Sequence, residues 1–129
     1  MGDRANFGLR HSNEAKDTVF VYGHWAGEDM LARFANALKV AKDNGRIDDD
    51  AYGTRIVVQA LLADAYSPTI GWGITVNYLA DNEHKVPVFD FATQAVTLYD
   101  MGGVCTFDKP LVTYPVGRFI DKYSKPLDF

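Results

Sequence analysis

The chain contains one cysteine, Cys105, among its 129 residues, so no internal disulfide can form. It has no apolar run long enough to cross a membrane. The polar stretch from Met1 to Arg4 leads into no apolar segment of the kind that a secretory signal peptide has. No asparagine stands in an Asn-x-Ser/Thr sequon. These absences favour a reducing, cytoplasmic setting without a membrane partner.

Positive charge is also scarce. There are 13 Lys and Arg residues against 17 Asp and Glu residues, which gives a formal net charge of −4, and the basic residues do not cluster. Binding to nucleic acid through phosphate neutralisation needs a basic face, so no nucleic-acid partner is expected. No glycine-rich phosphate loop and no G-x-S-x-G elbow occurs, so the sequence indicates no cofactor and no serine nucleophile.

The remaining composition is that of one globular domain. Hydrophobic residues make up 47% of the chain and charged residues 23%, and 129 residues suffice for a single core. We therefore expect residues 1–129 to form a single α+β domain.

Apolar periodicity predicts the elements of that domain. Alternation predicts five strands, near residues 4–10, 18–23, 71–79, 86–91 and 95–99. A 3.6-residue period predicts helices near 28–44 and 48–64, the second being the more buried. The order ββααβββ predicts a two-layer domain, in which a mainly antiparallel five-stranded sheet carries both helices on one face. Residues 116–123 have the spacing of a short last helix.

The first candidate site is the strand-to-helix junction from Tyr22 to Glu28, which holds His24, Trp25 and two glycines. His24 could act as an acid or base with Glu28 or Asp29 as its orienting carboxylate. The favoured reading is that His24 caps the strand and Trp25 lies buried between helix and sheet, because a single charged pair is weak evidence for catalysis.

The second candidate site is the polar stretch from Asp81 to His84. Its carboxylates and histidine suggest a divalent cation, but no ligand spacing of a metal site accompanies them. No metal is therefore predicted, and a solvated hairpin tip is the alternative. Whether His11 and the other two histidines converge is open. If a ligand or partner binds, we expect six residues to contact it: Tyr22, His24, Trp25, Glu28, Asp81 and His84.

Between these sites, Gly71 and Gly73 flank Trp72 on one face of a predicted strand. Without side chains, that face admits a close approach. The approaching group could be a helix of the same domain, a ligand or a partner chain, and packing of a helix is the commonest of these explanations.

Three short motifs carry a resemblance to a known group. They are Gly2-Asp3-Arg4-Ala5-Asn6, Tyr22-Gly23-His24-Trp25-Ala26-Gly27 and Asp81-Asn82-Glu83-His84. With them, the first hundred residues resemble small, uncharacterised proteins encoded by bacteriophages of actinobacteria. The resemblance implies a phage source and attaches no chemistry to the motifs. Small acidic phage proteins often bind a host or defence component.

The sequence thus favours a phage-type accessory protein that binds a host or defence component, either a protein or a small signalling molecule. One alternative is a small hydrolase or transferase that uses His24 and a carboxylate. Another is a structural homo-oligomer. A homodimer is expected in any case, because aromatics are 13% of the chain and Tyr99, Phe107, Tyr114 and Phe129 lie in its loosely patterned tail.

Overall fold

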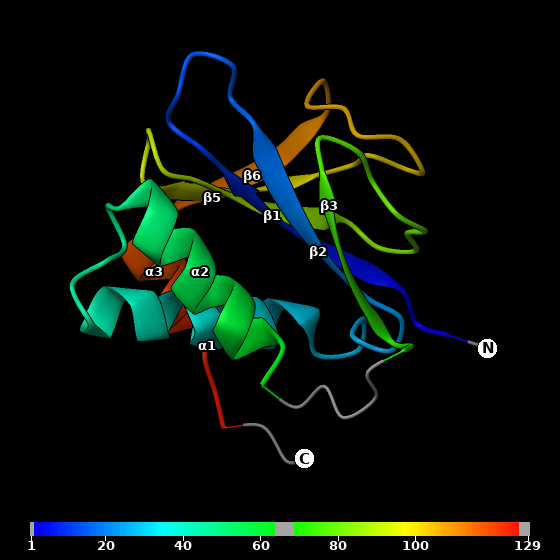
Figure 1. Cartoon of the computed structure of the whole chain (residues 1–129), viewed down its shortest axis with the longest axis horizontal. Helices are drawn as coiled ribbons and strands as arrows, with labels where there is room; N and C mark the ends of the chain where they lie inside the picture. Colours follow the sequence, from blue (N-terminus) through cyan, green and yellow to red (C-terminus); the bar gives the residue numbers. More distant parts are fainter. Residues whose placement is uncertain (1, 64–68, 127–129) are drawn as a thin grey trace.

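One mixed sheet of six strands, with helices over one of its faces, makes up the fold in this computed structural model, which describes residues 2–63 and 69–126 (Figure 1). In chain order the elements are β1 (Ala5–Arg10), β2 (Thr18–Gly23), α1 (Met30–Asp43), α2 (Asp50–Leu61), β3 (Trp72–Val76), β4 (Val86–Asp90), β5 (Ala95–Tyr99), β6 (Pro110–Pro115) and α3 (Val116–Tyr123). The order of strands across the sheet is β3-β2-β1-β4-β5-β6.

The predicted α+β class is confirmed, and the predicted strands and helices are all present within a few residues of their expected ends. The count of five strands and two helices is wrong. β6 was not predicted as a strand, and α3 coincides with the short helix predicted over residues 116–123. The sheet is antiparallel except at its centre, where β1 and β4 run parallel with Gly8 beside Val88.

The central position of β1 explains a second difference from the alternating pattern. The sequence predicts a half-buried strand, but both faces of β1 are covered. Phe7 and Leu9 face the helices, while Asn6 on the other face is 0% exposed. Polar Asn6 is therefore a buried residue that needs partners.

The main core lies between the sheet and the helices. Helix α1 is the most deeply packed helix, with seven buried residues that include Phe34 and Leu38. Helix α2 buries only Gly53, Val57 and Leu61, and it leaves Tyr52 55% exposed. The prediction that the second helix is the more buried is therefore wrong, since α2 lies on α1 while α1 also contacts α3.

A smaller core lies on the opposite face of the sheet. It is formed by Phe20, Leu79, Val86, Val88 and Met101. The loops before β4 and after β5 supply Leu79 and Met101, so they cover the face that the helices leave open. Cys105 packs against this cluster, and burial raises the pKa of its thiol, as expected for a small core residue.

The aromatic residues of the tail are mostly paired within the chain. The rings of Tyr99 and Phe107 meet at 5.1 Å, and those of Tyr114 and Tyr123 at 5.9 Å. Phe129 lies outside the described residues. These residues therefore give no support for the predicted homodimer. Within residues 2–63 and 69–126, no helix is both long and apolar enough to span a bilayer.

Candidate functional site

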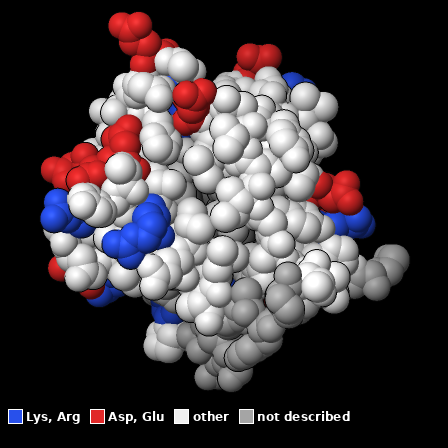
Figure 2. Space-filling view, viewed as in Figure 1, with Lys and Arg blue, Asp and Glu red and all other residues white. Residues whose placement is uncertain are grey.

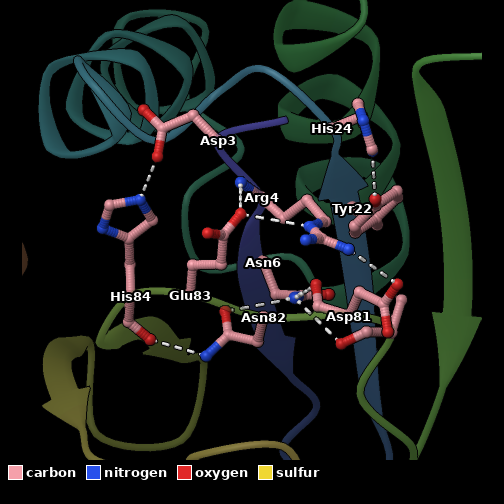
Figure 3. A network of polar contacts seen from close by, with 10 residues as sticks. Asp3, Arg4, Asn6, Tyr22, His24, Asp81, Asn82, Glu83 and His84 are labelled. Carbon is pink, nitrogen blue, oxygen red and sulfur yellow. Dashed lines mark hydrogen bonds and ion pairs between the residues drawn. The ribbon is translucent and has the colours of Figure 1, made fainter. Parts of the chain in front are cut away.

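Three segments far apart in sequence meet at the end of the sheet where β1 begins and β2 ends (Figure 3). They are residues 2–6, residues 22–27 and residues 81–84. The antiparallel register places Ala5 opposite Gly23, and the Glu83 N–H donates to the Arg4 carbonyl at 3.0 Å. The two predicted clusters therefore flank the N-terminal segment, which joins them.

Asp3 bonds to both clusters. Its N–H donates to the His24 carbonyl at 2.8 Å, and its own carbonyl accepts from the Gly27 N–H at 3.0 Å. Its carboxylate Oδ1 lies 2.5 Å from Nε2 of His84. A Cβ on Gly27 would collide with both of these side-chain atoms, so any larger residue there would displace the His84–Asp3 pair.

Arg4 holds the Asp81–His84 loop through its charge. Its N–H and its Nε both donate to Oε1 of Glu83, at 2.9 Å and 3.1 Å, and Nη1 reaches Asp81 at 3.2 Å. The hydrogen bond from the Arg4 backbone, followed by that from the guanidinium, lowers the pKa of Glu83. Because these groups are exposed, the ion pairs position the loop more than they stabilise the fold.

Asn6 holds the same loop through its side-chain amide. Its Nδ2 is close to three acceptors, the carbonyls of Ala80 and Asp81 and Oδ1 of Asn82, at 3.1 to 3.4 Å. Asn82 in turn donates to the carbonyls of His84 and Gly102. The alternating pattern placed Asn6 on the polar side of its strand, so nothing in the sequence distinguished it from a solvated residue.

His24 is paired with a tyrosine rather than with a carboxylate. The Tyr22 hydroxyl lies 2.8 Å from Nδ1 of His24, and burial raises the pKa of Tyr22. Glu28 is exposed, and the hydrogen-bond partner of the His24 ring is Tyr22 instead. Asp29, the other carboxylate considered for this role, accepts from Nε of Arg33 at 2.7 Å, so neither carboxylate orients His24.

Trp25 is exposed. Its side chain is 58% exposed, and its ring meets the His24 ring edge-on at 4.5 Å. It passes over Gly71, where a Cβ would lie 3.2 Å from the indole, and the Gly71 carbonyl accepts from the His24 N–H at 2.8 Å. The reading in which Trp25 is buried between helix and sheet is wrong.

Helix packing also does not explain the two glycines, because Gly71 lies against Trp25 and Gly73 against Tyr22.

Glu28 and His84 share a cleft of about 450 Å³ at the start of α1. The lining residues are Gly27–Ala32, His84, Lys85, Leu98, Lys122, Tyr123 and Lys125. Trp25 is not among them. The six predicted contact residues therefore divide into two groups. Tyr22, His24 and Trp25 form what we call the Trp25 surface, and Glu28 and His84 line the cleft, while Asp81 pairs with Arg4.

The three histidines do not converge. His11 follows the far end of β1, where Arg10 pairs with Thr18, and contacts Thr54 and Asp50 on α2. Within the described part of the chain, no three His, Cys, Asp or Glu side chains come together as metal ligands would. Residues 81–84 are also not a hairpin tip, because they connect β3, at the sheet edge, to β4 at its centre.

Compared with known proteins, the chain matches no family model, no curated protein and no solved structure.

Proposed function

We propose that this chain is a phage-type accessory protein that binds a host protein through the Trp25 surface. The observation that carries the proposal is the exposure of Trp25, at 58%, on a backbone that hydrogen bonds hold in place. Tryptophan is enriched among the residues that dominate binding energy, because it offers a large contact area at small entropic cost.

The surroundings of Trp25 support a contact that is already formed before binding. Its neighbour His24 is bonded through its backbone to Asp3 and Gly71 and through its ring to Tyr22. Both backbone bonds are 2.8 Å long, so the segment that carries the indole is tied to two other strands or loops. Binding a partner would therefore cost little conformational entropy on this side of the interface, because the surface is already ordered.

A protein partner fits this surface better than a small molecule. A small ligand is normally enclosed by a concave site, and the nearby cleft is lined by His84 and lysines without Trp25. The exposed indole and the exposed Ile70, next to Gly71 in the chain, offer apolar area of the kind that protein interfaces bury.

The test is affinity capture from host cells with tagged wild type, Trp25→Ala and Tyr52→Ala, followed by mass spectrometry. Tyr52 is a matched control, since it is an aromatic residue with 55% exposure on α2. We expect wild type and Tyr52→Ala to capture the same protein and Trp25→Ala to lose it. Equal capture by Trp25→Ala would contradict the proposal.

A second function, a small hydrolase, is favoured by one observation. His84 has a close carboxylate partner, Asp3 at 2.5 Å, and it lines the cleft with Glu28. In this role His84 is the base and Asp3 orients its ring. Turnover of chromogenic acyl or phosphate esters that is lost in His84→Ala would support a hydrolase. No turnover by the wild type would count against it.

A further inference from the structure

The two edges of the sheet are protected to different degrees. Edge strand β6 begins and ends with proline, Pro110 and Pro115, neither of which has an N–H to offer a neighbouring strand. Edge strand β3 has no such protection: residues 69–80 contain neither a proline nor a charged residue. Figure 2 shows the surface over β2 and β3 largely without charge. Natural proteins usually block an exposed edge with charge, proline or a bulge, so an open edge of this kind is typical of a strand that pairs.

The hydrogen bonds to β2 reveal which backbone groups of β3 face outward. His24 donates to the Gly71 carbonyl, and the N–H of Asn77 donates to Thr18. In an antiparallel pair such bonds involve alternate residues, so Gly71, Gly73, Thr75 and Asn77 face β2. The N–H and C=O groups of Trp72, Ile74 and Val76 therefore point away from the sheet.

The side chains of the same three residues lie on the helix-covered face. Trp72 packs against the main core with Arg33 of α1 over its ring, whereas Ile74 and Val76 extend beyond the helices. Ile74 pairs with Val21, a residue of the main core, yet it is 54% exposed, and Val76 is 56% exposed. An outward row of donors and acceptors thus coincides with an exposed apolar row. A second strand with β-branched side chains would pair with these backbone groups and also cover the exposed apolar side chains.

We propose that β3 pairs with β3 of a second copy of this chain, antiparallel, about a two-fold axis at Ile74. This register places Ile74 opposite its own counterpart and Trp72 opposite Val76. A two-fold axis brings identical residues together, and any charge near the axis would meet a like charge. Residues 69–80 carry none, which fits a second copy as the occupant. The result is one continuous sheet across the dimer.

This inference does not depend on the proposed function. The test compares the solution mass of wild type, Ile74→Lys and Leu111→Lys by light scattering at micromolar concentrations. Leu111 is the matched control, because it is also 54% exposed on an edge strand, the blocked β6. We expect wild type and Leu111→Lys at twice the chain mass of 14.3 kDa and Ile74→Lys at 14.3 kDa. A monomeric wild type, or a dimeric Ile74→Lys, would overturn the proposal.

A second readout locates the axis without adding charge. In a Cys105→Ser background, Ile74→Cys should be joined to a second copy by a short bis-maleimide cross-linker, whereas Leu111→Cys should not. Cross-linking at Leu111→Cys alone would place the interface at the other edge and overturn the proposal. Trp25→Ala should remain dimeric, so loss of partner capture and loss of the dimer are separable.

Discussion

Asn6 shows how a single buried amide can hold a loop that is distant in sequence. Its Nδ2 faces three oxygen acceptors, and its Oδ1 is buried without a partner among the described residues. A side chain that donates into a set of carbonyls cannot be replaced by one that only accepts. The loop from Asp81 to His84 therefore depends on an amide at position 6.

We predict that Asn6→Asp lowers the free energy of unfolding by about 3 kcal/mol at pH 7, since it places a carboxylate against those oxygens away from water. Because protonation relieves the repulsion, the loss should be smaller near pH 4. Urea unfolding at the two pH values measures this. Asn6→Ala should cost less and show little dependence on pH. An Asn6→Asp protein as stable as the wild type at pH 7 would contradict this role for the amide.

At the scale of elements, the start of α2 is tied to the loop after β1. The N–H and the hydroxyl of Ser12 donate to Oδ2 of Asp50, at 2.7 Å and 2.8 Å. Burial alone would raise the pKa of Asp50, but these hydrogen bonds outweigh it and hold the pKa below its ordinary value. The folded state therefore binds this proton less readily than the unfolded chain does.

It follows that the stabilisation by Asp50 is complete above the ordinary aspartate pKa of about 3.9 and is lost as the pH falls through the lower folded-state pKa. We predict that Asp50→Asn lowers the free energy of unfolding by about 1 kcal/mol at pH 7 and that the difference from wild type shrinks as the pH falls through the lowered folded-state pKa of Asp50. Denaturant titrations across this range test the sign. Asp48→Asn, at an exposed neighbour, is the control and should have no such effect. A difference that grows toward low pH would show the linkage to be wrong.

Helix α3 completes the helical layer with three buried residues, Val116, Phe119 and Ile120, of which Phe119 is the largest. Phe119 is 0% exposed, and its ring lies 6.1 Å from that of Phe34 on α1 and 5.0 Å from that of Tyr123. We predict that Phe119→Ala costs about 4 kcal/mol, from lost burial and the cavity left behind. The control is Arg118→Ala at the exposed neighbouring residue, which should hardly change the free energy of unfolding. Chemical denaturation measures both, and a loss below about 1 kcal/mol for Phe119→Ala would mean that α3 is not part of the core.

The elements that the sequence predicts well are those with local periodicity. The repeat of Met30, Phe34 and Leu38 predicts the buried face of α1, and all three are buried. β6 was missed because prolines stand at both of its ends, where they suggest loops, although an edge strand tolerates them. The relative burial of the helices was wrong because it depends on where α2 packs, not on its own apolar pattern.

At the scale of the whole molecule, the candidate site results from contacts between distant segments. The sequence identified the clusters around His24 and His84, but not that Asp3 and Arg4 join them, because hydrogen bonds across more than 75 residues leave no local pattern. The parallel pairing of β1 with β4 is equally non-local. The exposure of Trp25 follows from its place above Gly71, which no periodicity shows.

We propose Trp25 as a contact residue on a preformed surface. The most direct measurement is the dissociation constant of the captured host protein for wild type and for Trp25→Ala, with the melting temperature of each recorded. We predict an affinity about 30-fold weaker for Trp25→Ala, as for an interface residue worth about 2 kcal/mol, with a nearly unchanged melting temperature. Equal affinities, or a Trp25→Ala protein that unfolds, would contradict the claim.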